Sequence, residues 1–480
     1  MKLSALLEKI EYTGRFADCD TDFVTDDSRK VREGCVFVCS KGATFDGHTF
    51  AAKAVEIGAV LIVAEKDTGA ENQVIVKNSR AAYALLCSAL FGNPSEKMKM
   101  IAVTGTNGKT TSAFIIKDLL TQMGKKTGLM GTVQNMIGRQ IIPAKFTTPQ
   151  PYELHALLSQ MYKSGCEYVV MEASSQALRQ NRLYGIEFDA AVFTNLTRDH
   201  LDYHKTMDNY FAAKCILFEN SKKAVVNIDD RWGKKLAEKL DKNSTLTFSD
   251  RDDGADFTAK NTVYSQDSAK FIMVGKNSIN RVNFPMPGEY SVHNAMGAAL
   301  AAVSLGFDID RVCEALSKVS GVKGRCEVIV RQPFTVITDF AHTDDGLENI
   351  LSSLRPFVKG KFFVLFGCAG ERDATKRILM AKAVSKYADY VIMTSDNPRG
   401  ENRQSIIDGV TGYFDESGTP YTTEVNRRTA IQKALSMLSP GDTLILCGKG
   451  HEDYQALDGM SVYLDERVEV QKFMKSYCKE

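Results

Sequence analysis

Short apolar runs alternate with helical spacing along most of the chain. The runs are rich in β-branched or aromatic residues and lie at Met100–Val103, Tyr168–Met171, Ala190–Phe193, Ala224–Asn227, Phe362–Phe366, Tyr390–Thr394 and Thr443–Cys447. Between them, apolar residues recur at helical spacing in Ser112–Met123 and Asn294–Leu305. Continuous apolar strands alternating with helices are typical of a parallel sheet covered on both faces. The pattern therefore predicts an α/β fold.

Two turn-rich breaks divide this pattern. The polar stretch 91–97, which contains Asn93 and Pro94, precedes the first of the central runs, and Gly321–Gly324 precedes another apolar run at Glu327–Arg331. The chain has 480 residues, and at about 150 residues per domain this length suggests three domains. We expect the domains to span residues 1–98, 99–325 and 326–480.

Composition excludes several classes of protein. Apolar residues make up 44% and charged residues 25% of the chain, and the net charge is only +1. Such a balance lacks the basic field of a nucleic-acid binder, and the apolar runs are too short to span a bilayer. The N-terminal stretch has charged Glu8 and Lys9 where a signal peptide would be apolar, and the eleven scattered cysteines show no disulfide or zinc framework. We expect a cytoplasmic protein with reduced thiols.

A glycine-rich turn follows the first central run. Gly105-Thr-Asn-Gly-Lys-Thr110 lies between an apolar strand and a predicted helix, where backbone N–H groups and the helix N-terminus can surround phosphate oxygens. Lys109 would reach the β- and γ-phosphates, and the Thr110 hydroxyl would bind Mg²⁺. Val103 stands where the first glycine of the general phosphate loop belongs. The alternative is a tight strand–helix connection, but the lysine and threonine favour ATP binding.

Metal ligands are available at two neighbouring strand ends. Glu172 ends one apolar run, and the next run leads into a loop with two aspartates and the histidines His200 and His204. Ligands in α/β proteins gather at the carboxyl ends of strands, so Glu172 and His200 are candidate Mg²⁺ ligands beside the ATP phosphates. The alternative for the histidine pair is packing or a surface cluster.

These motifs together resemble the Mur ligase family of peptidoglycan synthesis. The likeness is carried by T-G-T-N-G-K-T-T, M-E-A-S-S and T-N-L-T-R-D-H-L-D-Y-H, and continues through D-S-R, T-T-P, Y-F-A-A-K-C-I-L-F, D-N-P-R and G-K-G-H-E. The motifs fall in order along nearly the whole chain and are similar to those of the MurE group, the UDP-N-acetylmuramoyl-tripeptide synthetases. The resemblance implies an N-terminal domain for the UDP-muramoyl substrate, a central P-loop ATPase domain and a C-terminal Rossmann-like domain carrying the amino-acid pocket.

The resemblance also implies a reaction. An ATP-dependent ligase of this type adds an amino acid to the D-Glu γ-carboxylate of UDP-MurNAc-L-Ala-D-Glu through an acyl phosphate. ATP and Mg²⁺ are the implied cofactors, with two metal sites, and Lys214 matches the family lysine whose carbamate bridges them. From its sequence position alone, Lys214 would lie on a helix surface. The implied partners are small-molecule substrates, without nucleic acid or membrane insertion, and we expect a monomer.

The resemblance implies the following site residues, position by position. Lys109, Lys214 and His200 are the expected catalytic residues, and the expected metal ligands are Thr110, Glu172, His200 and Lys214. ATP contacts are expected from Gly105, Thr106, Asn107, Gly108, Lys109, Thr110, Asn294, Arg325 and Asp339. Contacts to the UDP-muramoyl substrate are expected from Ser28, Thr147, Thr148, Ser174, Gln180 and Arg182.

The D-N-P-R motif bears on which amino acid is added. It is similar to the form found in family members that add meso-2,6-diaminopimelate, whose distal carboxylate an arginine can bind bidentately. The expected pocket consists of Arg372, Asp396, Asn397, Pro398, Arg399, Gly448 and Glu452. Without the resemblance, D-N-P-R would be a turn with a solvated arginine.

Three departures from the family pattern concern this pocket and its surroundings. Asn402 and Arg403 follow Glu401 where Asp-Pro is usual, Gln176 stands at a histidine position, and Ala374 ends a loop that usually ends in lysine. L-Lysine addition therefore stays an alternative, as does a ligase of the MurF or folylpolyglutamate synthase type. A nucleotide-binding pseudo-ligase would lack a metal or lysine ligand, and all are present.

Overall fold

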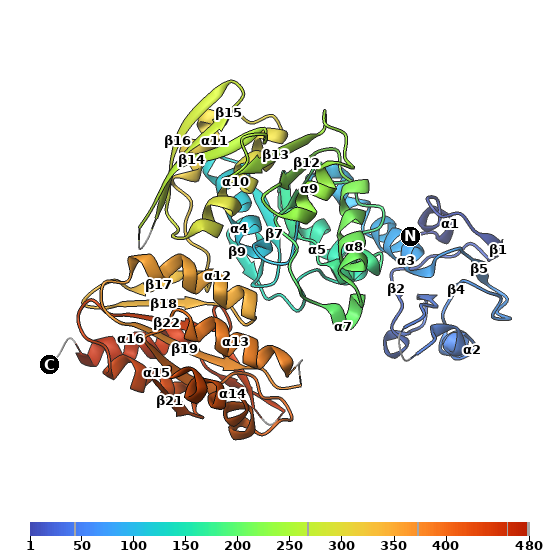
Figure 1. Cartoon of the computed structure of the whole chain (residues 1–480). Helices are drawn as coiled ribbons and strands as arrows, with labels where there is room; N and C mark the ends of the chain where they lie inside the picture. The colour runs from blue at the N-terminus through green and yellow to red at the C-terminus, as the bar shows by residue number, and fades with distance from the viewer. Residues whose placement is uncertain (43–44, 266–267, 372–373, 458, 478–480) are drawn as a thin grey trace. The chain divides into compact units, whose positions relative to one another are not determined.

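The computed structural model describes residues 1–42, 45–265, 268–371, 374–457 and 459–477 (Figure 1). These residues form two compact units: the first contains residues 1–248 and 300–307, and the second contains residues 249–299 and 308–480. Among the described residues, no helix combines the length and the apolar character that crossing a membrane requires. The fold is mixed α/β, as the sequence predicts.

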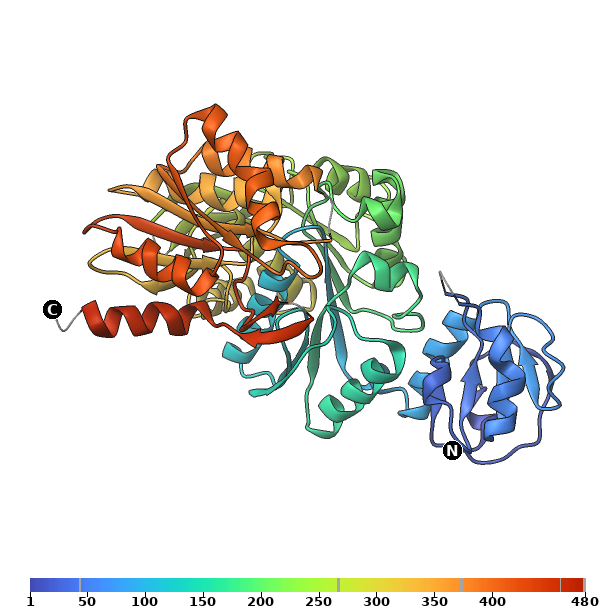
Figure 2. The same cartoon turned by 90° about the horizontal axis from the view of Figure 1, so that it is seen from below.

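The first unit begins with a small sheet (Figure 2). Its strand order is β1 (Thr13–Arg15), β5 (Gln73–Ile75), β4 (Leu61–Ala64), β3 (Val36–Val38) and β2 (Val24–Thr25). Alternate side chains of these strands pack on opposite faces, because successive residues of a strand point to opposite sides. Val36 and Val63 pack with helices α1 (Leu3–Leu6) and α3 (Ser79–Leu90), whereas Phe37 and Ile62 pack with α2 (Ala51–Ile57).

The larger sheet of the first unit supplies the strand ends that matter for function. Its parallel strands run in the order β13 (Thr245–Ser249), β12 (Ala224–Asn227), β11 (Ala190–Phe193), β6 (Lys99–Thr104), β10 (Tyr168–Glu172) and β7 (Thr127–Met130). Two antiparallel strands, β8 (Asn135–Ile137) and β9 (Gln140–Ile142), extend the β7 edge. The helices of this part are α4 (Lys109–Gln122), α5 (Pro151–Lys163), α6 (Ser175–Arg179), α7 (Leu201–His204), α8 (Met207–Glu219) and α9 (Arg231–Ala237).

Helix α5 buries a histidine without polar partners. His155 is fully buried, and neither of its ring nitrogens has a hydrogen-bond partner among the described residues. Burial disfavours the charged imidazolium and lowers the pKa of His155 from 6.5 to about 4. The ring is therefore neutral in the folded protein at neutral pH.

We expect this histidine to make the fold acid-sensitive. Between pH 6.5 and 4 the unfolded chain takes up a proton that the folded chain refuses, so stability falls as the pH falls, by at most about 3 kcal/mol. Replacing His155 with leucine should flatten the dependence of the urea midpoint on pH between 7 and 5. The same change at exposed His342 is the control, and equal slopes in both variants would contradict the expectation.

The second unit contains an antiparallel hairpin layer and a Rossmann-like sheet. The antiparallel strands are β14 (Phe257–Tyr264), β15 (Ala269–Gly275) and β16 (Ser278–Phe284). Helix α10 (Glu289–Ser304) begins in the second unit and ends in the first, and α11 (Ile309–Leu316) follows it. The sheet has the order β17 (Glu327–Val330), β18 (Thr335–Asp339), β22 (Thr443–Cys447), β19 (Phe362–Cys368), β20 (Tyr390–Ser395) and β21 (Tyr421–Glu424).

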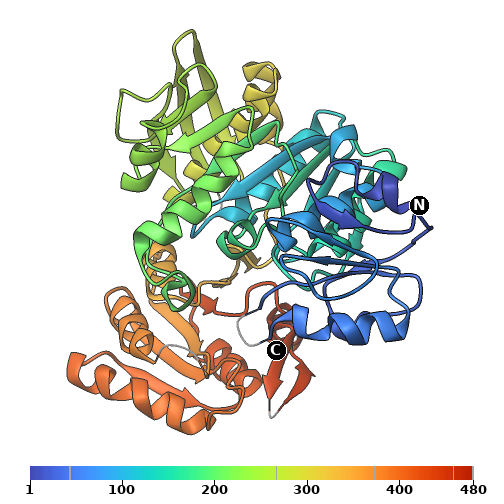
Figure 3. The same ribbon diagram turned by 90° about the vertical axis from the view of Figure 1, so that its right-hand side faces the viewer.

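Helices cover both faces of the Rossmann-like sheet. Helices α12 (Asp344–Leu354), α13 (Thr375–Ser385) and α14 (Arg403–Ser417) pack on one face, and α15 (Arg427–Ser436) and α16 (Glu466–Tyr477) pack on the other. A two-stranded ribbon, β23 (Tyr454–Leu457) with β24 (Met460–Tyr463), precedes α16 and is drawn in red in Figure 3.

Each of the seven apolar runs and both helical segments predicted from the sequence is present as a strand or helix. The predicted parallel sheet does not account for the antiparallel strands β14, β15 and β16. More and less exposed residues alternate in β16 and in the second half of β14, so neither strand shows a continuous apolar run.

Candidate functional site

The glycine-rich turn joins β6 to α4 in the first unit. Gly105 has a φ of +155° and Gly108 a φ of +83°, backbone conformations that side chains disfavour. A Cβ on Gly105 would lie 1.9 Å from the Thr194 hydroxyl oxygen, so only glycine fits there. The turn therefore brings backbone close to the neighbouring strand end and opens α4 at Lys109, which is a suitable shape for binding phosphate.

Two lysines converge on this turn. The Lys109 ammonium donates to the carbonyl oxygens of Gly105 at 3.0 Å and Thr106 at 2.8 Å. Lys214, on α8, donates to the same Gly105 oxygen at 2.7 Å and lies 4.6 Å from the centre of the Tyr210 ring. Both amines are thus held where phosphate oxygens are expected.

The expectation that Lys214 lies on a helix surface was wrong. Its exposure is only 1%, because α8 buries the face that carries Tyr210, Phe211 and Lys214. Burial lowers the pKa of Lys214 well below its ordinary value, and the nearby Lys109 charge lowers it further. Burial of this kind favours the uncharged form of the amine.

Glu172 ends β10 as a fully buried carboxylate surrounded by hydroxyls. Its Oε2 accepts from the hydroxyls of Thr110 and Thr132, each at 2.9 Å, and its Oε1 accepts from the Thr132 amide at 2.7 Å. Sequence reasoning missed Thr132, whose only signal is its position at the end of a parallel strand. Carboxylate and hydroxyl oxygens are hard donors that suit Mg²⁺.

His200 precedes α7 in a strained backbone conformation, with a φ of +52°. Its Nε2 lies 3.4 Å from the Asp199 carboxylate. Burial, together with the charges of Lys109 and Lys214, lowers the pKa of His200 despite the opposing effect of Asp199. A neutral imidazole can bind a metal ion through nitrogen.

The second histidine of this loop has a packing role. His204 is buried, pairs with the Ser175 hydroxyl at 2.9 Å and stacks on Tyr210 at a centroid distance of 5.0 Å.

Most residues expected to contact the UDP-muramoyl substrate surround the end of β10. The Thr148 hydroxyl donates to the Glu172 carbonyl at 2.7 Å and accepts from the Ser174 amide at 3.1 Å. Arg182 donates to the Gln180 side chain at 2.7 Å and to the Thr148 carbonyl at 3.0 Å. Thr147 lies nearby, 3.0 Å from the Thr132 hydroxyl. Ser28 lies in the N-terminal sheet region. It is the first residue of a short 3-10 helix that Asp27 caps.

The second unit holds the other residues expected to contact ATP. Asp339 ends β18, and its carboxylate accepts from the amides of Cys326 and Ala341, each at 2.7 Å. Burial raises the pKa of Asp339, against the lowering effect of Arg325 and these amides. The Arg325 guanidinium lies 4.6 Å from the Phe340 ring centre. Asn294 is half-buried on α10.

Two backbone segments, one before β17 and one after β22, cross beside Arg325. A Cβ on Gly324 would lie 2.0 Å from the His451 amide nitrogen, and one on Gly450 would lie 2.5 Å from the Gly324 carbonyl oxygen. Both glycines have positive φ. The segment before β17 and the loop after β22 can therefore approach only with glycine at both places.

The residues expected to hold the amino acid gather at the ends of β20 and β22. Arg399 has a φ of +54° and donates to the Gly370 carbonyl at 3.0 Å, and the Gly370 amide donates to the Asn397 carbonyl at 3.0 Å. A Cβ on Gly370 would lie 1.9 Å from the Pro398 oxygen, and one on Gly448 would lie 3.1 Å from an Asp396 oxygen. Arg372 lies outside the described residues.

Lys449 is a central residue that sequence reasoning missed. It is fully buried, and its ammonium lies 2.6 Å from Asn397 Oδ1, 2.9 Å from Glu452 Oε2 and 3.2 Å from Asp396 Oδ1. Burial would raise the pKa of Asp396, but Lys449 and Arg427 lower it below its ordinary value. Its place inside the G-K-G-H-E motif was the signal. The cluster therefore brings polar groups of both signs of charge together at the ends of β20 and β22.

Comparison with known proteins identifies the family. Residues 20–86 match the model of the Mur ligase family catalytic domain, residues 103–302 the Mur ligase middle domain, and residues 324–450 the Mur ligase glutamate ligase domain. A protein of Clostridium tetani, named UDP-N-acetylmuramoyl-L-alanyl-D-glutamate–2,6-diaminopimelate ligase, is 41% identical over 99% of both chains. The chain belongs to the Mur ligase family.

Other Mur ligases are similar over the same length. The ligase of the same name from Listeria monocytogenes is 39% identical, with 98% of each chain covered. A solved structure of a diaminopimelate ligase matches with a TM-score of 0.73 at 32% identity and covers 100% of both chains. MurF from Acinetobacter baumannii, at 18% identity and a TM-score of 0.62 over 99% of both chains, shows the fold alone. The expected Mur ligase fold is therefore confirmed.

One departure from the Mur ligase pattern has a simple local role here. Asn402 caps α14, and its side-chain oxygen accepts from the Ser405 amide at 3.1 Å. Arg403 is the first residue of that helix. Gln176 lies within α6, beside the buried Ser175 that pairs with His204. Asparagine is a favoured helix cap, so position 402 retains a capping role.

Proposed function

We propose that this Mur ligase adds meso-2,6-diaminopimelate to the D-Glu γ-carboxylate of UDP-MurNAc-L-Ala-D-Glu at the expense of ATP. The observation that carries the proposal is the 41% identity over 99% of the chain to a ligase named for that reaction. The domain limits of residues 1–98, 99–325 and 326–480 belong to the same proposal.

The groups around Gly105 suit ATP and Mg²⁺. The turn supplies backbone N–H groups and Lys109 for phosphates, while Thr110 and Glu172 supply oxygen ligands already within hydrogen-bond distance of each other. The neutral His200 ring would add a nitrogen ligand. When bound, Mg²⁺ neutralises phosphate charge and orients the γ-phosphoryl group.

Lys214 suits a carbamate role at the second metal position. A neutral lysine amine adds to CO₂, so that an N–C bond forms, a proton is lost and the side chain becomes an anionic oxygen ligand. Burial beside Lys109 supports this role, because it favours the uncharged amine from which the carbamate forms.

The reaction then needs two displacements. A γ-carboxylate oxygen of D-Glu attacks the γ-phosphorus of ATP, the bond to the bridging oxygen breaks, and ADP leaves an acyl phosphate behind. The amine of the amino acid adds to the acyl carbon, inorganic phosphate leaves, and the amine proton passes to solvent. The chain's contribution is to position reactants and stabilise charge, with Lys109 at the phosphates.

The pocket of the second unit favours diaminopimelate over L-lysine. Arg399 is a guanidinium able to bind the distal carboxylate, which lysine lacks, and Glu452 can oppose the distal ammonium. The ten cysteines in the described part of the chain are all free, which supports a reducing, cytoplasmic location.

An amino-acid panel tests the proposal. With UDP-MurNAc-L-Ala-D-Glu and ATP present, we expect phosphate release with meso-diaminopimelate and at least about 100-fold lower kcat/KM with L-lysine, because a site built to pair a charged group rejects an analogue without it. Equal turnover of the two would remove the specificity claim. No turnover with any amino acid would remove the ligase assignment and favour a pseudo-ligase.

A further inference from the structure

Strand β23 of the two-stranded ribbon lies beside the segment 396–399, which carries the D-N-P-R motif. Leu457 of this strand forms a parallel β-bridge with Arg399. One residue earlier, the Ala456 amide donates to Asn397 Oδ1 at 2.8 Å. The ribbon is therefore joined to the loop from which Arg399 is expected to reach the amino acid.

Gln455 is the residue of β23 whose side chain holds the beginning of this loop. It is buried, and its Nε2 donates to the Asp396 carbonyl at 2.6 Å and to the Ser395 carbonyl at 3.2 Å. A primary amide has two N–H donors, so it can satisfy both oxygens at once. Gln455 lies three residues beyond the G-K-G-H-E motif and belongs to none of the motifs of the pocket.

The loop needs such support because its backbone is strained. Arg399 has a φ of +54°, a left-handed conformation that residues other than glycine rarely adopt. A conformation of this kind persists only where surrounding contacts fix it. The contacts of Gln455 fix Ser395 and Asp396, from which the chain turns toward Arg399.

Other contacts of the loop do not depend on Gln455. The Lys449 ammonium lies 2.6 Å from Asn397 Oδ1, and the Gly370 amide donates to the Asn397 carbonyl at 3.0 Å. Arg399 in turn donates to the Gly370 carbonyl at 3.0 Å. We therefore expect the loss of the Gln455 amide to displace the loop without unfolding it.

We propose that Gln455 is a positioning residue that places Arg399 and thereby sets the selectivity for an amino acid with a distal carboxylate. The inference rests on the proposed function, because it takes Arg399 as the ligand of that carboxylate. A guanidinium binds a carboxylate through two parallel hydrogen bonds only when the two planar groups are aligned. A displaced loop should weaken binding of diaminopimelate and leave L-lysine, which has no distal carboxylate, unaffected.

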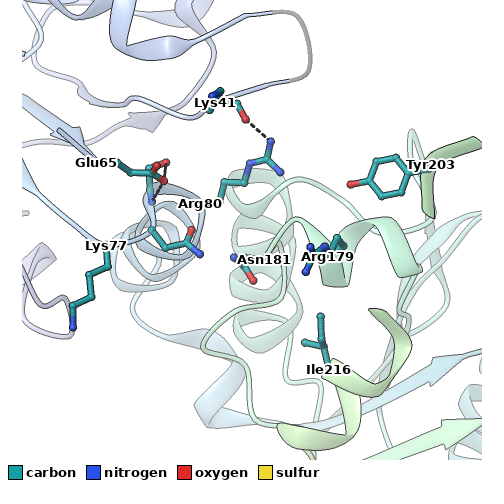
Figure 4. A pocket seen from close by; sticks show the side chains of 10 residues that line it. Lys41, Glu65, Lys77, Arg80, Arg179, Asn181, Tyr203 and Ile216 are labelled. Atoms are coloured by element: carbon teal, nitrogen blue, oxygen red, sulfur yellow. Dashed lines mark hydrogen bonds between the residues drawn. The ribbon is translucent and has the colours of Figure 1, made fainter. Parts of the chain in front are cut away.

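Steady-state kinetics of Gln455→Met tests the proposal. Methionine has a similar length but no N–H donor. The KM for meso-diaminopimelate should rise about tenfold, the loss expected for one buried hydrogen bond, while kcat/KM with L-lysine stays unchanged. The KM for ATP should stay unchanged. The KM for UDP-MurNAc-L-Ala-D-Glu should too, because the residues expected to contact it lie in the first unit, where Gln180 donates to Tyr203 in the wall of the cavity shown in Figure 4.

A matched glutamine of the second unit is the control. Gln432, on α15, also donates through its side-chain amide to a backbone carbonyl, that of Glu469 at 3.1 Å, but this acceptor belongs to α16. Gln432→Met should keep the wild-type KM for diaminopimelate. Gln455→Asn retains an amide on a shorter side chain and should raise that KM less than Gln455→Met does. It also serves as the test variant if Gln455→Met does not fold.

The outcomes separate this proposal from the proposed function. If the wild type prefers diaminopimelate and Gln455→Met only lowers kcat equally with both amino acids, the role is structural and the positioning assignment is wrong. A wild type without diaminopimelate turnover, or with equal turnover of L-lysine, overturns the proposed function instead. Hydrogen exchange of the amides of residues 396–401 then decides on Gln455, since it needs no activity. Exchange should be faster in Gln455→Met than in the wild type and Gln432→Met, and equal exchange in all three overturns the positioning role.

Discussion

Replacing Lys214 with alanine is expected to lower kcat by about 100-fold or more, the loss typical of removing one group that stabilises transition-state charge. Lys214 is buried, with its amine nitrogen 2.7 Å from the Gly105 carbonyl oxygen at the phosphate turn. Single-turnover formation of the acyl phosphate measures the affected step directly. Lys109→Ala should fail in the same step, since it removes the phosphate-binding amine.

The nature of the Lys214 contribution can be tested by rescue. If the functional form is a carbamate, added formate or acetate should restore part of the activity of Lys214→Ala, because a small carboxylate replaces the lost anionic oxygens. Methylamine should do so only if the side chain acts as a cation. Lys222→Ala, at an exposed lysine that pairs with Asp189 at 3.3 Å, is the control and should keep wild-type rates. A wild-type rate in Lys214→Ala would remove the catalytic assignment.

Replacing Lys449 with methionine is expected to destabilise the protein by about 3–5 kcal/mol, because it leaves the buried carboxylate of Asp396 and the half-buried carboxylate of Glu452 without their cation. The lysine is fully buried and has oxygen atoms of three side chains within 3.2 Å. Urea unfolding of the variant measures the loss. In enzyme that remains folded, the KM for diaminopimelate should rise while the KM for ATP stays unchanged.

A matched lysine in the same unit provides the control. Lys472 pairs with Glu469 at 3.0 Å, three residues apart as in the Lys449–Glu452 pair, but its side chain is 61% exposed. Lys472→Met should cost no more than about 1 kcal/mol, as for other exposed ion pairs. A similar loss of stability in both variants would show that burial does not give Lys449 its importance.

The sequence predicts seven strands of the two larger sheets because these strands are buried on both faces. Their apolar runs are continuous, as at Ala190–Phe193 and Thr443–Cys447, and these bounds agree with β11 and β22. Strands β14 and β16 carry no such run, because more and less exposed residues alternate in β16 and in the second half of β14. Strand β15 does contain an apolar run, Phe271–Val274, which was not among the predicted strands.

The site residues also differ in whether neighbouring residues in the sequence are enough to predict their environment. The strand–turn–helix context of Lys109 and Thr110 is local, so the phosphate turn can be predicted from neighbouring residues. The burial of Lys214 depends on a contact with Gly105, 109 residues away in the chain, and helical periodicity alone places this lysine on a surface. Lys449 is similar, because its partner Asn397 lies 52 residues earlier and only the fold brings them together.

The crossing of Gly324 with Gly450 has a consequence for the order of folding. The two glycines come from segments far apart in the chain, and their backbones approach too closely to tolerate a Cβ. Closing so long a loop costs entropy that only later contacts repay, so such contacts tend to form late. We expect the loop with Lys449 and Glu452 to acquire its final shape only after the segment before β17 has docked. We therefore expect the amino-acid pocket to take its final shape late in the folding of the second unit.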